Sequence, residues 1–303
     1  MSKYLVTGGA GFIGTNIVKE LIRQGNQVVV FDNYAAGKKE DRMQPEATYV
    51  EGDIRNSDDL NSVCKQGFDG IFHLAALPRV SFSVENPLLT HGANIDGTLN
   101  VLLAARDHKI KRVVFSSSSS VYGNQETFPL QEDMKPVPIS PYALHKFVGE
   151  NYCRLFSNLY GVETVSLRYF NVYGPYFDPE GAYALVIGKF IKQVKDGKPM
   201  TVCGDGEYFR DYTHVNDIVR ANILAMQSSA VGKGDVLNIG NGNPHSVNEL
   251  VKLIGGAFEF VPERPGDVRY TEADSTKAKN LLGWEPTIRL EEGVAELKKE
   301  WGL

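Results

Sequence analysis

Short apolar runs recur through the first half of the chain, and each run ends in small or polar residues. They occupy residues 4–7, 28–31, 49–51, 70–74, 112–115 and 163–168. Between the first two runs, Ile13, Ile17 and Leu21 recur at the spacing of a helix. Buried strands that alternate with helices predict a parallel sheet covered by helices on both faces.

The pattern changes after Asn171. Turn residues such as Gly174-Pro175 mark a long connection. Residues 186–194 and 247–254 then have helical spacing, and residues 236–239 read as one more buried strand. The second half is therefore expected to be mixed α/β with longer loops.

A chain of 303 residues can build one large core or two modest ones. We expect a Rossmann-type, doubly wound α/β domain over residues 1–170, with a later strand near residues 236–240 returning to it. Residues 171–303 are expected to form mainly a smaller α/β domain.

Glycines 8, 11 and 14 lie between the first predicted strand and the first predicted helix. This context favours a turn whose backbone approaches a pyrophosphate at the N-terminus of a helix. Asp32 ends the second strand, roughly 20 residues further on, where a carboxylate can accept hydrogen bonds from a ribose. That carboxylate would repel a 2′-phosphate, so NAD is favoured, although Lys38 and Lys39 leave NADP open.

Small and polar residues follow the next strands. Asp53, Ala75 and Ala76 and the serine run (residues 116–120) each come at a strand end. In parallel sheets, ligands bind beyond the carboxyl ends of the strands, so we expect these residues to line one crevice. The two alanines would admit a flat ring, or would serve helix–strand packing.

Tyr142 and Lys146 stand four residues apart in a segment with helical spacing, so they share one helix face. A lysine beside a phenol favours the phenolate and lowers its pKa, which would make a general base. Alone, this spacing equally fits a half-buried tyrosine beside a solvated lysine. Arg210 and Arg264 lie in glycine-rich loops and are either clamps for a diphosphate or solvated charges.

Composition narrows the class of partner. With 37 acidic and 32 basic residues the net charge is -5, which argues against a nucleic-acid partner or an anionic membrane. The chain has no apolar run near the roughly 20 residues of a membrane helix, and no leader pattern. Cys64, Cys153 and Cys203 show no paired spacing, and the histidines show no metal-ligand spacing, so we expect a cytoplasmic protein without a metal.

Taken together, the motifs resemble the extended short-chain dehydrogenase/reductase superfamily, in its nucleotide-sugar branch, over essentially the whole chain. The matching segments are residues 7–14, 53–54, 73–76, 116–123, 142–146, 168–171 and 210–212.

The resemblance implies a tightly bound NAD and a UDP-sugar substrate. It assigns the cofactor to Gly8, Gly11, Phe12, Ile13, Gly14, Asp32, Asn33, Asp53, Ile54, Leu74, Ala75, Ala76, Asn94, Ser116, Tyr142, Lys146 and Tyr169. It assigns the UDP-sugar to Ser118, Tyr142, Asn171, Thr201, Val202, Cys203, Arg210, Arg264, Asp267 and Thr271.

Within that branch, the serine run is similar to the 4-epimerases, because 4,6-dehydratases and UDP-xylose-forming decarboxylases carry acidic residues there. The resemblance makes Ser118, Tyr142 and Lys146 the catalytic residues. Tyr142 would take the proton of the sugar 4-hydroxyl while C4 gives a hydride to NAD⁺. The 4-keto sugar would then turn over and take the hydride back on its other face.

The resemblance also bears on the sugar. In the family, the seventh residue after Arg264 is bulky in enzymes restricted to glucose and galactose, and here it is Thr271. We therefore expect UDP-GlcNAc/UDP-GalNAc interconversion, with UDP-Glc/UDP-Gal as additional substrates. Residues 178–184 and 267–270 also resemble the acetylhexosamine type. Gly188, where the family usually has proline, is expected to loosen the start of a helix.

Three other functions stay open from sequence. A UDP-glucuronate 4-epimerase would share the serine run and would need a cation such as Arg79 for the C6 carboxylate. A net dehydrogenase or reductase would release its cofactor. A non-catalytic scaffold would have lost Tyr142 or Lys146. The resemblance further implies a homodimer formed through the helices that begin near Asn94 and Pro141.

Overall fold

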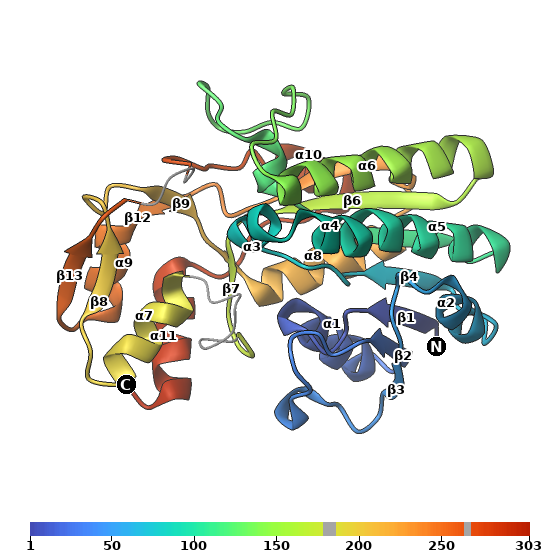
Figure 1. The fold of residues 1–303 in the computed structure, drawn as a ribbon, viewed down its shortest axis with the longest axis horizontal. Helices are drawn as coiled ribbons and strands as arrows, with labels where there is room; N and C mark the ends of the chain where they lie inside the picture. Colours follow the sequence, from blue (N-terminus) through green and yellow to red (C-terminus); the bar gives the residue numbers. More distant parts are fainter. Residues whose placement is uncertain (178–185, 264–267) are drawn as a thin grey trace.

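A parallel sheet of seven strands forms the centre of the computed structural model, which describes residues 1–177, 186–263 and 268–303 (Figure 1). In spatial order the strands are β3 (Thr48–Glu51), β2 (Gln27–Asp32), β1 (Lys3–Thr7), β4 (Gly70–His73), β5 (Arg112–Ser118), β6 (Glu163–Tyr169) and β11 (Lys233–Ile239). The strand order reverses between β1 and β4, which is where such sheets open a crevice at their carboxyl ends. The predicted Rossmann-type fold class is confirmed.

Helices cover both faces of the sheet and enclose two cores. On one face lie α1 (Phe12–Arg23), α8 (Val215–Gln227) and α10 (Thr276–Leu282), with Ile17, Ile218 and Trp284 fully buried. On the other lie α2 (Ser57–Cys64), α5 (Gly97–Asp107) and α6 (Pro141–Tyr160). Each fully buried aliphatic side chain contributes about 1.5–3 kcal/mol of transfer free energy, so the sheet is a rigid base for its loops.

The chain between β4 and α5 contains three short helical segments: α3 (Val80–Glu85), α4 (Pro87–His91) and the π-helical turn η2 (Gly92–Asp96). The regular helix expected from Asn94 therefore begins three residues later, at Gly97, after this wider turn. The irregular start brings α3 close to the beginning of α6, as described below.

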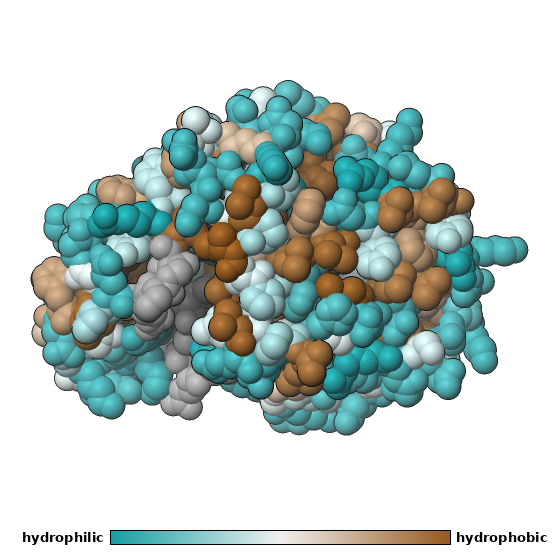
Figure 2. Space-filling model, turned by 45° about the horizontal axis from the view of Figure 1, so that its top comes forward, coloured by the Kyte–Doolittle hydropathy of each residue, from teal (hydrophilic) through white to brown (hydrophobic). Residues whose placement is uncertain are grey.

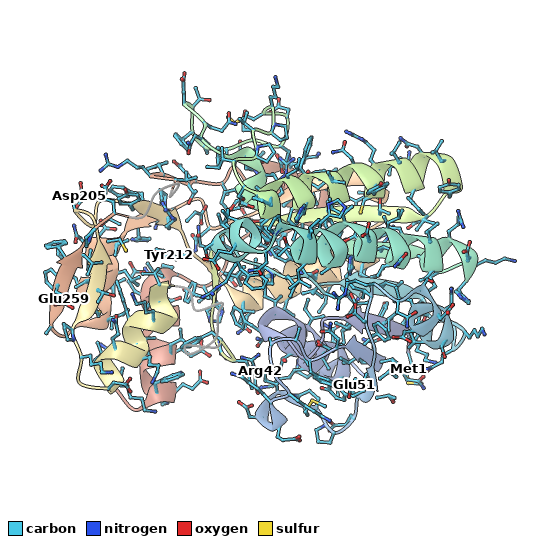
Figure 3. All side chains as sticks on the ribbon, in the orientation of Figure 1. Met1, Arg42, Glu51, Asp205, Tyr212 and Glu259 are labelled. Carbon is cyan, nitrogen blue, oxygen red and sulfur yellow. The ribbon has the colours of Figure 1, made fainter. Side chains whose placement is uncertain are left out.

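The second half builds its own core from α7 (Val186–Lys195), α9 (Val247–Ile254) and α11 (Leu290–Trp301), around buried Phe190, Leu250 and Leu297. Three two-stranded sheets belong to this half: β7 (Val172–Tyr173) with β10 (Thr213–His214), β8 (Met200–Cys203) with β13 (Phe258–Val261), and β9 (Phe209–Asp211) with β12 (Pro244–Ser246). Tyr212, labelled in Figure 3, is buried in this second core directly between β9 and β10.

Polar contacts hold the chain where it leaves the sheet. Arg42, also labelled in Figure 3, is buried and donates to the carbonyl oxygen of Tyr176 at 2.6 Å. Asn16 of α1 donates to the carbonyl oxygen of Pro175 at 3.1 Å. Within the described ranges, none of the helices combines the length and apolar character needed to cross a bilayer.

Candidate active site

The glycine turn between β1 and α1 leaves no room for side chains. Gly8 has a φ of 71°, and its N–H donates to the carbonyl of Phe31 at 2.9 Å. A Cβ on Gly8 would lie 2.6 Å from the backbone nitrogen of Ala75, and one on Gly14 would collide with the carbonyl of Gly8. The backbone can therefore approach a phosphate closely at the N-terminus of α1, as the cofactor assignment requires.

Three polar residues that the sequence assigns to the cofactor, Asp32, Asn33 and Asp53, lie together at the ends of β2 and β3. Asp32 accepts the N–H groups of Ala10 at 3.0 Å and Tyr34 at 2.8 Å, so it ties the glycine turn to its own strand. Burial raises the pKa of Asp32, and these two donors lower it. Asn33 donates to Asp53 at 2.9 Å.

Asp53 is also paired with its neighbour two residues on. The Arg55 guanidinium lowers the pKa of Asp53 to about 2, so this carboxylate is charged at neutral pH. Ile54 faces inward, where its side chain fills the space that a Cβ on Gly97 would need. The Ile54 side chain therefore packs in the core, and its main chain is what remains available to a ligand.

The loop after β4 is shaped by Asn94. Its amide oxygen accepts the N–H of Leu77 at 2.7 Å, and its amide nitrogen donates to the carbonyl of Leu77 at 3.1 Å. The side chain is buried and holds the loop that follows Leu74, Ala75 and Ala76, and the cofactor contact expected of Asn94 stays a prediction. Those three residues are half-buried at the strand end.

The first three serines of the serine run continue β5, and the 3₁₀ turn η3 (Ser119–Tyr122) follows. Successive strand residues face opposite ways, so Ser116 and Ser118 are half-buried whereas Ser117 is buried. Lys146 reaches this strand end, and its Nζ donates to the carbonyl of Ser116 at 2.7 Å. Burial lowers the pKa of Lys146 to about 8, although Cys153 and Glu150 raise it.

Tyr142 stands in the first turn of α6, where two serines accept helix N–H groups. Ser140 is the N-cap and accepts from Ala143 at 3.2 Å, and Ser83 of α3 accepts from Tyr142 itself at 3.0 Å. The phenol is hydrogen-bonded with Ser118. Tyr142, Ser118 and Lys146 are therefore brought to one point, as their sequence assignment requires.

The prediction that Lys146 lowers the pKa of the Tyr142 phenol is wrong for the protein without a ligand. Burial raises the pKa of Tyr142 to about 12, and the bond with Ser118 lowers it only in part. The reason is the position of the ammonium group: it bonds the Ser116 carbonyl and lies 5.8 Å from the centre of the tyrosine ring. The phenol is thus neutral at pH 7 without a further positive charge.

A second polar cluster, missed in the sequence, lies behind the first. Ser117 donates to Glu150, and Arg168 pairs with both carboxylate oxygens of Glu150, at 2.9 and 2.8 Å. Arg168 also stacks over Tyr122 at 4.6 Å. Its position could have indicated Glu150, because this residue lies one further helical turn along the face of α6 that carries Tyr142 and Lys146.

Tyr169, assigned to the cofactor, ends β6 and is paired with Ser118 in the sheet, and Asn171, assigned to the substrate, follows two residues later. The Tyr169 hydroxyl donates to Asn222 at 2.9 Å inside the core, so only its main chain can reach a ligand. Asn171 donates to the carbonyl of Asp211 at 3.0 Å and to the Thr271 hydroxyl at 3.4 Å. Thr271 therefore lies next to the strand end that carries Ser118.

Asp211 fixes this junction. It is buried and accepts the N–H groups of Asn241, Gly242 and Ala273 at 2.7–2.9 Å. Burial raises the pKa of Asp211 to about 6, and the three donors oppose that rise. Its own N–H donates to the Thr271 hydroxyl at 3.3 Å.

The remaining residues that the sequence assigns to the UDP-sugar are spread over the second half. Thr201 accepts from Gln193 at 3.2 Å, Val202 is buried and Cys203 is partly exposed, so Val202 can offer only its main chain. Arg210 lies over the ring of Tyr208 at 5.7 Å. The predicted Arg264 and Asp267, and the motif at residues 178–184, fall outside the described residues.

The looser helix start expected at Gly188 stays a prediction, and the structure shows what surrounds this glycine. It lies within the first turn of α7 as described, and a Cβ there would collide with the ring of Phe177. That ring stacks on Trp301 of α11 at 5.2 Å. The glycine therefore makes room for an aromatic contact between elements, and the helix start is packed.

Comparisons with known proteins agree with this geometry. Residues 4–240 match the family described as NAD dependent epimerase/dehydratase. The UDP-glucose 4-epimerase of Thermotoga maritima, solved with UDP-glucose, is 40% identical, with a TM-score of 0.94 and coverage of 99% of this chain and 98% of that one.

Two further solved structures carry other substrate names. The UDP-N-acetylglucosamine 4-epimerase of Methanobrevibacter ruminantium, in complex with UDP-N-acetylmuramic acid, is 37% identical with a TM-score of 0.93, covering 99% of this chain and 98% of that one. The UDP-glucuronic acid 4-epimerase of Bacillus cereus, with UDP-glucuronic acid and NAD, is 31% identical with a TM-score of 0.90, covering 99% of each chain. The chain therefore belongs to the NAD-dependent epimerase/dehydratase family, as an NAD-dependent UDP-sugar 4-epimerase of the extended short-chain dehydrogenase/reductase superfamily.

Proposed function

We propose that the chain interconverts UDP-GlcNAc and UDP-GalNAc by inverting C4, and that it also accepts UDP-Glc and UDP-Gal. The observation that carries this proposal is the setting of Thr271. This small side chain adjoins Asn171, two residues beyond the strand pair that holds Ser118, and its hydroxyl is engaged by Asn171 and the N–H of Asp211. We propose that a side chain of this size, held in this way, would leave space for a substituent on the neighbouring sugar carbon.

The proposed chemistry follows from the three residues at the strand end. When bound, NAD⁺ supplies a hydride acceptor at C4 and a positive charge that favours the phenolate. Tyr142 takes the proton from the sugar 4-hydroxyl and later returns it, so it serves as base and then as acid. Ser118 donates a hydrogen bond at that oxygen and stabilises its negative charge. Lys146, fixed by the Ser116 carbonyl, keeps a second positive charge nearby.

We propose that residues 171–303 mainly hold the UDP group. Asn171, Thr201, the main chain of Val202, Cys203 and Arg210 would contact it, together with Arg264 and Asp267. A guanidinium is suited to this task because its fork of donors matches phosphate oxygens. Anchoring the diphosphate would let the sugar turn over between the two hydride transfers while the nucleotide stays bound.

UDP-glucuronate is the second candidate substrate. Arg79 supports it, because it stands at the start of α3, four residues before the Ser83 hydroxyl that accepts the N–H of Tyr142. Its φ of 127° is rare for a residue with a side chain, and such backbone strain gathers at ligand sites. A cation there could pair with a carboxylate at C6.

One assay separates these candidates. Turnover of five substrates, UDP-GlcNAc, UDP-GalNAc, UDP-Glc, UDP-Gal and UDP-glucuronate, is followed by separating the products of wild type and Thr271→Tyr. We expect wild type to convert the acetylated pair, and the variant to lose at least about 10-fold on that pair while keeping the plain hexoses. No turnover of the acetylated pair by wild type, or fast turnover of UDP-glucuronate alone, would contradict the proposal.

We also propose that NAD stays bound through successive turnovers, because each catalytic cycle restores its oxidation state. Protein purified without added NAD should then carry the cofactor, and turnover should leave the nicotinamide absorbance unchanged. A cytoplasmic location is proposed as well: the three cysteines are free thiols, as in reducing compartments.

A homodimer is proposed through the helices α3 to α6. Val84, Leu88, Leu144, Leu155 and Leu159 are 47–88% exposed on α3, α4 and α6. Figure 2, which looks onto this side of the molecule, shows hydrophobic residues gathered over these helices. A patch of this kind is typical of an interaction surface.

Sedimentation measurements test the dimer. Wild type is expected to sediment as a dimer and Leu155→Lys as a monomer. Phe258→Lys is the matched control, because Phe258 is equally exposed, at 48%, on β13. A monomeric wild type would refute the assignment, and so would a dimer that survives Leu155→Lys.

A further inference from the structure

Ser118 makes more hydrogen bonds than its proposed role alone requires. Its oxygen accepts the N–H of Ser120 at 3.2 Å and also bonds the Ser120 hydroxyl at 2.9 Å. The same Ser118 hydroxyl bonds the phenol of Tyr142 and lowers its pKa. Both serines are half-buried, Ser118 as the last residue of β5 and Ser120 in the turn η3 that follows it.

The number of bonds fixes their direction. A serine hydroxyl has one proton to donate and two lone pairs to accept. The Ser120 N–H and the Ser120 hydroxyl both donate to the Ser118 oxygen, so they occupy its two lone pairs. The single Ser118 proton is then left to donate, either to the Tyr142 phenol or to a sugar oxygen beside it.

We propose that Ser120 is a positioning residue for the reaction: its hydroxyl donates to Ser118, so that the Ser118 proton points only at Tyr142 and the reacting sugar oxygen. This inference rests on the proposed catalytic roles of Ser118 and Tyr142. The backbone N–H of Ser120 holds the Ser118 oxygen in place, and the hydroxyl occupies its last lone pair. Ser118 then has no competing arrangement in which its proton turns away.

This chain of hydrogen bonds from Ser120 through Ser118 to Tyr142, here called the relay, also strengthens the bond that Ser118 donates. A hydroxyl that accepts a hydrogen bond becomes a better donor, because each bond in a chain polarises the next. Ser120 therefore helps Ser118 to stabilise the phenolate. The charged groups around the phenol, Lys146 on α6 and the Glu150–Arg168 pair behind it, are untouched by a change at Ser120.

The neighbouring serine provides a matched control. Ser119 is half-buried in the same turn, and in the part of the chain that the structure describes its hydroxyl has no hydrogen-bond partner. Ser119→Ala removes the same atom one residue away and should change nothing. Ser120→Thr keeps the hydroxyl and should restore what Ser120→Ala loses.

The first readout is kinetic, on whichever UDP-sugar wild type converts. For Ser120→Ala we expect a roughly 3- to 10-fold lower kcat with KM within about 2-fold, the effect of one lost hydrogen bond. Because the phenolate is less stabilised, the acid limb of the kcat profile should move to higher pH by about 0.5 to 1 unit. Unchanged kcat in Ser120→Ala, or a loss confined to KM, would overturn the proposal.

The second readout does not depend on turnover. The NAD-bound protein carries isotope-labelled tyrosine ring carbons, and the Tyr142 signal is identified by its loss in Tyr142→Phe. Its titration should move to higher pH in Ser120→Ala and stay in place in Ser119→Ala and Ser120→Thr. An unmoved titration refutes the relay. A moved titration in a protein that converts none of the UDP-sugars would refute the proposed substrate and leave the relay supported.

Discussion

The face of α6 that meets β5 carries two polar clusters one helical turn apart. The open end comprises Tyr142 and Lys146 with the half-buried Ser118. The sealed end comprises Glu150 with Ser117 and Arg168, each 2–4% exposed. Both ends join a serine hydroxyl of β5 to ionisable side chains of α6. They differ because the open end can exchange a proton with a ligand, whereas the sealed end holds fixed charges.

The difference comes from the strand and from charge balance. Alternation along β5 sends Ser117 into the core and Ser118 to the crevice. At the sealed end two opposite charges satisfy each other, and the bond with Glu150 raises the pKa of Arg168 even though burial alone would lower it. At the open end burial opposes charge on Tyr142 and on Lys146 without such a partner. The protonation states of Tyr142 and Lys146 can therefore be changed by a charged ligand that binds beside them.

Tyr142→Phe is the change with the largest expected effect. It removes the proton carrier of the open end and keeps the ring, so kcat should fall by about 10⁴-fold, or about 5.5 kcal/mol of barrier. Steady-state rates on the converted UDP-sugar measure it. Binding of UDP-sugar and NAD by calorimetry is the control and should stay near wild type, as should the denaturation midpoint. If the variant keeps more than a tenth of the wild-type activity, Tyr142 does not carry the proton in the reaction.

Glu150→Gln, at the sealed end, should mainly lower the free energy of unfolding. It leaves the buried Arg168 charge without its partner, and breaking one side of a buried pair costs about 3–5 kcal/mol. Urea denaturation gives the free energy of unfolding. Glu20→Gln is the control, because the same change at the exposed pair with Arg23 should shift the midpoint little. Equal shifts in the two variants would show that the sealed end is not structurally special.

The adjacent serines offer the sharpest contrast. Ser118→Ala should lower kcat by about 10²-fold and leave unfolding unchanged, because it loses a donor at the reacting oxygen. Ser117→Ala should lower the unfolding free energy by about 1.5–3 kcal/mol, the value of a hydrogen bond to a charged group, and keep kcat within a few-fold. Both variants are measured by both methods. If each serine affected both quantities alike, the two clusters would be one functional unit.

What could be predicted from sequence was local. The glycine turn, Asp32 at its strand end and the spacing of Tyr142 and Lys146 depend on residues close together in the chain, and the structure has them in the expected elements. Helix α8 has a local signal too, since Val215, Ile218 and Val219 have helical spacing.

The remainder depends on packing between distant segments. Ser83 reaches the N–H of Tyr142 across 59 positions of sequence, and no local pattern near either residue indicates it. The raised pKa of Tyr142 was missed for the same reason, because desolvation is set by all the elements that enclose the phenol. The position of Lys146 on the Ser116 carbonyl likewise required the strand and helix to be placed together.

The smallest predicted effect is a difference between the two clusters in how the free energy of unfolding depends on pH. Lys146 has a pKa of about 8 in the fold, against 10.5 ordinarily, so between these values the folded chain binds fewer protons than the unfolded chain. The free energy of unfolding should therefore rise with pH there, by about 1 kcal/mol per unit near pH 9. Lys146→Met keeps the shape and should lack this rise, as measured by urea denaturation at several pH values.

The sealed end should behave differently in the same titration. Ser117→Ala changes no group that gains or loses a proton between pH 8 and 10.5, so its stability curve should run parallel to that of wild type at a constant distance below it. Groups elsewhere cancel in each comparison with wild type. If Lys146→Met also runs parallel, the ammonium of Lys146 is not desolvated in the fold. The open end would then share the fixed charge of the sealed end, and Lys146 could contribute to the chemistry only by its position.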